Sequence, residues 1–265
     1  MKVYADALDQ NLLCIHYDFS DDCPINRETA LACFEPGVKQ KIWWRYYHTY
    51  IGLQTLVAYE GHQPVGHVEF MPIEHAPRSI VGQDLTVINC LYVPEANRGQ
   101  GIGRMLIDAA ECQAQTVSAG FVVVAYQNDE FMPKGYFEHV GFSCVDERDD
   151  KCLLVKRSPK AKSPSFLPIR YQPRETTGAL AVDFFLPHQC PFFGWAGERL
   201  RRAVRKLPYR VELQLIQITD RPAIERWGIA QGLFIDGHEE PGLHPWATTP
   251  EKIIERLNVL SSNRN

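Results

Sequence analysis

Strand-like patterns dominate the first part of the chain. Residues 56–60 and 64–71 alternate apolar and polar side chains on either side of Gly61, which is typical of a β-hairpin. Residues 86–93 are rich in β-branched and aromatic side chains, which favours a further strand. Residues 120–126 form a continuous apolar run, as expected for a strand that is buried on both faces. The pattern therefore predicts a sheet.

Helical spacing appears between these strands and after them. Apolar residues follow the period of a helix at Ile102, Met105, Leu106, Ala109 and Ala110. Residues 136–140 are predicted to form a short helix that Gly141 ends as its C-cap. Residues 144–145 and 152–156 are predicted to pair as a last hairpin.

The region before this sheet has a mixed pattern. Residues 12–17 read as a strand, and Asn26 reads as the N-cap of a helix that begins at Arg27. Residues 43–50 form an aromatic cluster. The cluster has two interpretations, core packing with a half-exposed helix face or the wall of a substrate pocket, and the sequence leaves both open.

The pattern changes at residues 158–177, where four prolines punctuate a stretch containing lysine, arginine and serine. Such a composition predicts a stiff, extended linker. We therefore expect one domain over residues 1–157 and a second over 178–265.

The second domain has the order β-α-β-α-β-α. Strands are predicted at 180–185, 211–215 and 233–237, and helices at 195–207, 221–227 and from a capping box at Thr248 and Glu251 onward. The first of these helices is basic and amphipathic, with Leu200, Val204 and Leu207 on one face.

Composition narrows the class of protein. The 265 residues suffice for two modest domains, and 45% hydrophobic with 23% charged residues is ordinary for a globular protein. A net charge of −4 gives no support to nucleic-acid or membrane binding, and no apolar run is long enough to cross a bilayer. Asp6 falls where a signal peptide would be apolar. The eight cysteines show no C-x-x-C and no zinc spacing, so we expect reduced thiols, a cytoplasmic location and no metal.

The turn between the strand over 86–93 and the helix from Ile102 is rich in glycine. Pro94 ends the strand, and the turn runs from Arg98 to Gly103. Glycines let a backbone approach a ligand, and the first amides of a helix have no internal partner. The combination predicts an anion site that suits a pyrophosphate. A dinucleotide site is the alternative, but the motif comes late in the chain for a first βα turn.

Two motifs narrow this prediction. The pattern Arg98-x-x-Gly101-x-Gly103, preceded by 91–95 (LYVPE), resembles the signature of the GNAT superfamily of N-acetyltransferases. Residues 135–142 (GYFEHVGF) resemble the closing motif of the same superfamily. The resemblance covers about the first 157 residues. It implies a mixed α/β sheet with helices on both faces, acetyl-CoA as co-substrate, and a small-molecule amine as acceptor, and it leaves a homodimer open.

The same resemblance assigns the acetyl-CoA contacts. Backbone amides of the glycine turn would hold the pyrophosphate, and backbone groups of Leu91 and Val93 would pair with the pantetheine arm as an added strand. Arg98 and Arg104 flank the amides and would contact phosphate. The full set of candidate cofactor-binding residues is Leu91, Tyr92, Val93, Arg98, Gly99, Gln100, Gly101, Ile102, Gly103, Arg104 and Asn128.

Candidate catalytic residues are fewer. An alkylamine with a pKa near ~10 must lose a proton before it attacks a thioester. Glu69 is the first candidate for this base and His67 the second, since both share one face of a predicted strand. The family's general-acid tyrosine corresponds to Phe137, with Tyr136 beside it. An offset of one helical residue turns a side chain by ~100°, so Tyr136 is a candidate acid whose reach to the thiolate is open.

The second domain resembles the thioredoxin-like C-terminal domain of YoaP-like acetyltransferases. Cys190-Pro191-Phe192-Phe193 follows its first strand, but Phe193 replaces the second cysteine of a C-x-x-C motif, and no proline precedes the strand at 233. Two roles for this domain are open. It either docks a partner or covers the active site, or Cys190 reacts without a second cysteine. Three functions therefore stay open: an N-acetyltransferase, a non-catalytic acetyl-CoA sensor, and a thiol-dependent activity at Cys190.

Overall fold

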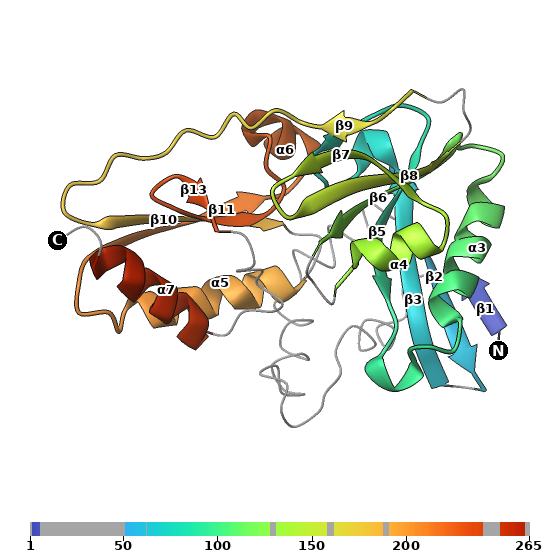
Figure 1. The fold of residues 1–265 in the computed structure, drawn as a ribbon, viewed down its shortest axis with the longest axis horizontal. Coiled ribbons are helices and arrows are strands. Elements are labelled where there is room, and N and C mark those ends of the chain that lie inside the picture. The colour runs from blue at the N-terminus through green and yellow to red at the C-terminus, as the bar shows by residue number, and fades with distance from the viewer. Residues whose placement is uncertain are drawn as a thin grey trace. The chain divides into compact units, whose positions relative to one another are not determined.

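The computed structural model describes residues 2–5, 51–61, 63–127, 131–157, 162–187, 191–240 and 250–262 (Figure 1). The described residues form two compact units, one of residues up to 166 and one of residues 167–262. The strand expected at 12–17, the helix at Arg27 and the aromatic cluster at 43–50 lie outside the described residues. No helix in the described part of the chain has the length and hydropathy needed to span a membrane.

The first unit is built on a seven-stranded mixed sheet in the order β1-β2-β3-β5-β6-β8-β7. Its strands are β1 (Lys2–Ala5), β2 (Gln54–Glu60), β3 (Gln63–Pro72), β5 (Thr86–Tyr92), β6 (Gly120–Tyr126), β7 (Ser143–Arg148) and β8 (Lys151–Arg157). Only β5 and β6 are parallel, and the other neighbours are antiparallel. The predicted hairpins and the mixed sheet are confirmed, whereas the edge strand β1 was not predicted.

The pairing of β5 and β6 stops early. Residues 86–88 pair with residues 121–123, and no pairing of the two strands is recorded beyond Ile88. On its other side, β5 pairs with β3 through an irregularity: Glu69 lies opposite Cys90, and Phe70 lies opposite Ile88. Asn89 is therefore the extra residue of a β-bulge, which bends the strand at the point where β5 leaves β6.

Two helices accompany this sheet, α3 (Ile102–Ala114) and α4 (Lys134–His139). The buried stripe of α3 consists of Ile102, Leu106, Ile107, Ala110 and Ala114. A Cβ at Gly66 would lie 3.1 Å from the Ile102 side chain, so α3 packs on the face of β3 to which Gly66 belongs. The expectation of helices on both faces is tested for this face alone by the described residues.

The segment predicted as a linker is extended but anchored. Its two-residue strand β9 (Ser165–Phe166) pairs with β4 (Ile80–Val81), and the Phe166 ring is buried in the first unit. Tyr171 and Leu167 pack against the core of the second unit. Prolines account for the extended backbone, but the apolar side chains between them are used for packing. The domain limits at 157 and 178 stay a prediction.

The second unit has a four-stranded sheet in the order β11-β10-β12-β13. Its strands are β10 (Leu180–Pro187), β11 (Val211–Ile218), β12 (Gly232–Ile235) and β13 (His238–Glu239). Its helices are α5 (Pro191–Val204), α6 (Arg221–Trp227) and α7 (Pro250–Ser262). The predicted order is confirmed, with the addition of the unpredicted two-residue strand β13 before the last helix. The helix predicted at 195–207 begins and ends earlier, because Pro191 is acceptable in a first turn and residues 205–206 form a turn.

Alternation along β10 divides this unit into two cores. Leu180, Val182 and Phe184 face a core that includes Leu200 of α5 and Leu257 of α7. The opposite face presents Phe185 to a second core containing Ile224 of α6. Because β10 and β11 are parallel and α5 connects them, while β12 is antiparallel to β10, helices α5 and α7 cover one face and α6 covers the other (Figure 1).

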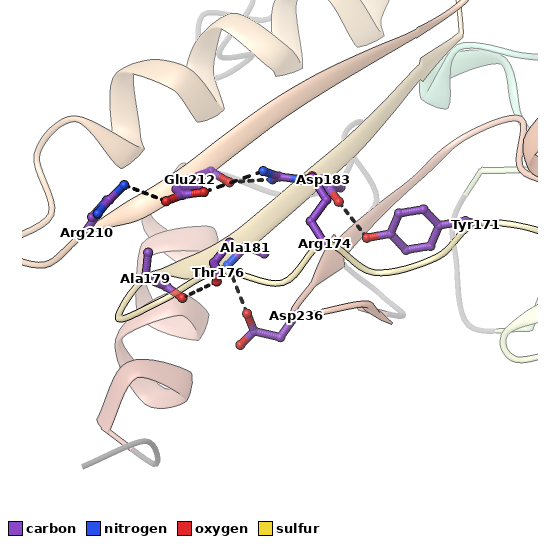
Figure 2. A network of polar contacts seen from close by, with 9 residues as sticks. All are labelled: Tyr171, Arg174, Thr176, Ala179, Ala181, Asp183, Arg210, Glu212 and Asp236. Atoms are coloured by element: carbon purple, nitrogen blue, oxygen red, sulfur yellow. Dashed lines mark hydrogen bonds and ion pairs between the residues drawn. The ribbon is translucent and has the colours of Figure 1, made fainter.

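A charged group lies inside the second unit. The Asp183 carboxylate on β10 is 1% exposed, and the Arg174 guanidinium donates to it at 2.6 and 2.9 Å. The Tyr171 hydroxyl donates to its second oxygen at 2.6 Å. Figure 2 shows Arg174 between Asp183 and Glu212, whose backbone oxygen it also contacts. Burial and the Asp183 carboxylate raise the pKa of Tyr171, so that its hydroxyl stays a donor.

Candidate functional site

The turn between β5 and α3 has the backbone that the sequence predicted. It contains the short helix η4 (Glu95–Asn97), and Gly99 and Gly101 both have left-handed backbones, with φ of 76° and 78°. A Cβ at either glycine would meet nothing within 4 Å. Glycine is therefore needed here for its conformation, and the space beside both residues is open.

The first turn of α3 offers unused amide donors. Gly101 is the N-cap, and the first helical hydrogen bond runs from the Met105 N–H to the Gly101 oxygen at 3.0 Å. The amides of Ile102, Gly103 and Arg104 precede that bond, and no side chain caps the helix at Gly101. Three amides and the positive end of a 13-residue helix thus face the open glycine turn, which is an arrangement that binds anions.

The side chains around the turn have different roles. Arg98 Nε donates to the Val93 backbone oxygen at 3.1 Å, so Arg98 ties the turn to the end of β5. Gln100 Nε2 donates to the Ala96 oxygen at 3.4 Å within the turn. The Arg104 side chain is 60% exposed and lies 3.8 Å from Asp108 one helical turn away. Of the two arginines expected at phosphate, Arg98 is held by a backbone oxygen, whereas Arg104 is largely exposed and pairs with another exposed side chain.

Tyr136 lies against the first turn of α3. Its hydroxyl oxygen would be 2.5 Å from a Cβ at Gly103, and it has no hydrogen-bond partner among the described residues. Burial, with a smaller contribution from Asp108, raises the pKa of Tyr136 to about 12. Phe137, at the family's tyrosine position, is fully buried and packs edge-on against Phe142. The one-residue offset therefore places the hydroxyl beside the predicted pyrophosphate amides.

The free edge of β5 is occupied by a thioether. The Leu91 N–H donates to the Met132 Sδ at 3.3 Å, and Met132 is buried with φ of 51°. Sulfur is a weak acceptor, so a stronger acceptor from a ligand would form a better hydrogen bond with the Leu91 N–H in its place. Val93 has fewer backbone groups available for the pantetheine arm than expected, since its oxygen already accepts a hydrogen bond from Arg98. Asn128, the last predicted cofactor contact, lies outside the described residues.

The two candidate bases lie together on β3. His67 and Glu69 are each 3% exposed, and they lie opposite Tyr92 and Cys90 of β5. Directly opposite residues of an antiparallel pair share a face, so all four side chains belong to the face that α3 does not cover. The structure thus brings the two candidates next to the strand that bulges at Asn89, while the assignment of the base stays a prediction.

Asn89 is a buried polar residue that the sequence reasoning did not select. It is fully buried, and neither its side-chain oxygen nor its nitrogen has a hydrogen-bond partner among the described residues. Its backbone oxygen accepts from the Arg78 guanidinium. An asparagine in an otherwise apolar strand is unusual, and that exception is the signal that could have identified it.

Part of the chain that includes this turn is similar to known proteins. Residues 52–144 match the family described as acetyltransferase (GNAT) domain. A curated relative, the uncharacterized N-acetyltransferase YoaP of Bacillus subtilis (strain 168), is 24% identical over 184 residues, which cover 65% of this chain and 70% of the relative.

Two solved structures are similar to part of this chain. The PaiA N-acetyltransferase of Thermoplasma acidophilum, in complex with coenzyme A, has a TM-score of 0.42 at 12% identity and covers 60% of this chain and 100% of its own. A GNAT family acetyltransferase from Brucella melitensis, in complex with acetyl-CoA, has a TM-score of 0.37 at 17% identity, and the match covers 61% of this chain and 92% of that one.

The matched residues include β5, the glycine turn and α3. Residues 52–144 are therefore similar to the acetyltransferase (GNAT) domain, as the motifs predicted, and the chain is distantly similar to YoaP. The C-terminal unit lies outside the residues that match the family, so the match does not identify it.

Proposed function

We propose that the chain is an N-acetyltransferase that uses acetyl-CoA and transfers its acetyl group to an amine of a small molecule in the cytoplasm. The observation that carries the proposal is the open glycine turn at the start of α3, where the amides of residues 102–104 precede the first helical hydrogen bond. The family match supports acyl transfer. The acceptor class, the location and a homodimer rest on the resemblance alone.

The chemistry needs a base, a carbonyl donor and a place for the thioester. Backbone amides at the β5 bulge would polarise the thioester carbonyl, since β5 leaves β6 there. Glu69, with His67 as the second candidate, would take the proton of the amine directly or through water. Both side chains are buried beside this bulge, which favours proton transfer in a site from which water is largely excluded.

The anion site can be tested at Gly101. Aspartate and asparagine both tolerate a left-handed backbone, and their side chains have nearly the same shape. Gly101→Asp adds a negative charge beside the proposed pyrophosphate, whereas Gly101→Asn does not. We expect acetyl-CoA affinity, measured by calorimetry, to fall at least tenfold more in the aspartate variant. Equal affinity in the two variants would refute the site.

A second candidate function is acetyl-CoA binding without catalysis. The observation that favours it is the position of Tyr136, whose hydroxyl lies beside Gly103 rather than in the position of the family's acid. Release of CoA thiol in the presence of a panel of amines separates the two functions. Binding without thiol release by any amine would favour a sensor.

We also propose that the second unit is a thioredoxin-like domain. The sheet order β11-β10-β12-β13, the parallel connection through α5, and the placement of α6 opposite α5 and α7 support this assignment, because that fold has the same connectivity. Cys190 directly precedes α5 but lies outside the described residues. A pH-dependent alkylation rate that is lost in Cys190→Ser would support a reactive thiol, and a rate typical of an ordinary thiol would leave the domain a docking role.

A further inference from the structure

Three side chains that can bind metal gather on the β7–β8 hairpin. The Cys144 and Cys152 sulfurs and a Glu147 carboxylate oxygen all lie within 4.8 Å of one another. Glu147 lies directly opposite Cys152, and Cys144 lies opposite Leu154, two residues further along β8. Because residues two apart on a strand share a face, all three project from the same side of the hairpin. A register shift between Cys144 and Asp146 lets Cys144 and Glu147, which are three positions apart, lie on the same face.

The two sulfur-to-oxygen distances in this cluster match the corresponding edges of a tetrahedral zinc site. Zinc binds cysteine sulfur at about 2.3 Å and carboxylate oxygen at about 2.1 Å, so the sulfur and oxygen ligands of a tetrahedron are about 3.6 Å apart. The Cys144 and Cys152 sulfurs lie 3.5 and 3.7 Å from Glu147 Oε1. We propose that Cys144, Glu147 and Cys152 form a site for a thiophilic divalent cation of the Zn²⁺ class, with solvent as the fourth ligand.

Sequence spacing did not reveal this site. The cysteines are eight positions apart and Glu147 lies between them, which is none of the usual zinc spacings. The bulged hairpin brings the three side chains together, and the spacing rules behind the expectation of no metal do not cover such a hairpin.

The charges near the cluster are compatible with a metal ion that takes the place of the Lys134 ammonium beside Glu147. The Lys134 ammonium lies 2.9 Å from Glu147 Oε1 and 3.9 Å from Glu138. Lys134 therefore supplies the positive charge in the metal-free chain, and Glu138 can retain it when a metal arrives. Binding would convert the two thiols to thiolates and release two protons to solvent. Gln127 hydrogen-bonds to the Cys152 sulfur, as an outer partner of a metal ligand does.

The competing interpretation is a cluster of thiol–carboxylate hydrogen bonds around Lys134. Cys144 and Cys152 are both free thiols in the structure, and each sulfur is within hydrogen-bond range of Glu147. This interpretation makes Lys134 essential to the cluster, whereas a metal site makes Lys134 a competitor. The two interpretations therefore predict opposite effects of removing the lysine charge.

Cobalt is a suitable probe, because thiolate-to-Co²⁺ charge transfer absorbs in the near ultraviolet. The full reduced chain, freed of metal, is titrated with Co²⁺. We expect one saturable equivalent of Co²⁺ with a thiolate band. In C144S and in E147Q the cobalt affinity read from this band should fall by more than ~10–100-fold, the cost of losing an outer partner of a metal ligand. Zn²⁺ should displace the cobalt. In K134M the affinity should be unchanged or tighter.

Controls separate this cluster from the other thiols. Cys112 is exposed on α3 and is not a member of the cluster, so C112S should bind cobalt as the parent does. C144S and E147Q change exposed residues, and their circular dichroism should match that of the parent. Any of three results would overturn the proposal: a thiolate band in C144S and E147Q that matches the parent's, no band in the parent, or a loss of binding in K134M. The proposal does not rest on the acetyltransferase function.

Discussion

At the scale of single residues, the hydroxyl of Tyr136 connects stability with mechanism. It is buried against Gly103 without a hydrogen-bond partner in the described part of the chain, and its pKa of about 12 keeps it protonated at neutral pH. A buried, unsatisfied hydroxyl opposes folding. A group retained at such a cost lies beside the amides expected to hold pyrophosphate, where it could contact the cofactor, and its role as the acid stays a prediction.

Tyr136→Phe tests this interpretation. Because the change removes an unsatisfied polar atom, the free energy of unfolding of the ligand-free chain, measured in urea, should rise by at least ~1 kcal/mol. Turnover should fall less than about tenfold, since general acid catalysis typically contributes 10²–10⁴-fold. A larger loss of turnover at unchanged acetyl-CoA affinity would show that the hydroxyl does act as the acid.

The buried carboxylate of Asp183 makes a second prediction at this scale. Arg174→Met leaves that carboxylate, 1% exposed, with Tyr171 as its remaining side-chain donor. Breaking a buried pair by removing one partner costs about 3–5 kcal/mol, so the midpoint of urea unfolding should fall markedly. Arg210→Met is the matched control, because Arg210 also pairs with Glu212 but is 69% exposed and should contribute less than ~1 kcal/mol. Equal losses in the two variants would contradict the argument.

At the scale of elements, α3 and α4 meet where Gly103 leaves room for Tyr136. A Cβ at Gly103 would lie 2.5 Å from the hydroxyl oxygen and 3.1 Å from the ring carbon that carries it. Alanine is otherwise favoured over glycine in a helix by about 1 kcal/mol. The local preference and the contact between helices therefore oppose each other at this residue.

A double-mutant cycle measures that opposition. Gly103→Ala should destabilise the parent chain, or stabilise it by less than the helix preference predicts. The same change in a Tyr136→Phe background should be more favourable by about 0.5–3 kcal/mol, the usual range for residues in contact. Thermal and urea unfolding of the four variants supply the cycle. Additive effects would show that the two helices do not touch at this point.

Elements were predictable where a signal is local. The strand over 120–126 and the helix over 221–227 have the bounds that their patterns predicted, because an apolar run and a proline near a helix start are signals contained within the element. Strand β1 has four residues, and β4 and β9 have two each, which is too short for a period to show. They exist because a partner strand is nearby in space.

The candidate site divides in the same way. The glycine turn was predictable, since its left-handed glycines and the following helix are adjacent in sequence. The contact of Tyr136 with Gly103, the Met132 sulfur at Leu91, and the bulge at Asn89 depend on residues far apart in the chain. No period or motif within one segment records such pairings.

At the scale of the whole molecule, the described contacts of the first unit continue as far as Phe166. Phe166 is 8% exposed, its N–H donates to Asp146 at 2.9 Å, and the Arg148 guanidinium lies 4.7 Å from its ring centre. The strand pair β4–β9 also ends at this residue. A chain cut after residue 157 loses all of these contacts, whereas one cut after 166 keeps them.

Two fragments therefore test where the first unit ends. Burying a phenylalanine side chain contributes about 1.5–3 kcal/mol, so the fragment 1–166 should melt at a clearly higher temperature than the fragment 1–157. Phe166→Ala in the longer fragment should remove most of the difference. If 1–166 also binds acetyl-CoA as the full chain does, the cofactor site is complete within the first unit. If binding needs the full chain, the second unit contributes to the site, and the search for an acceptor must use both units together.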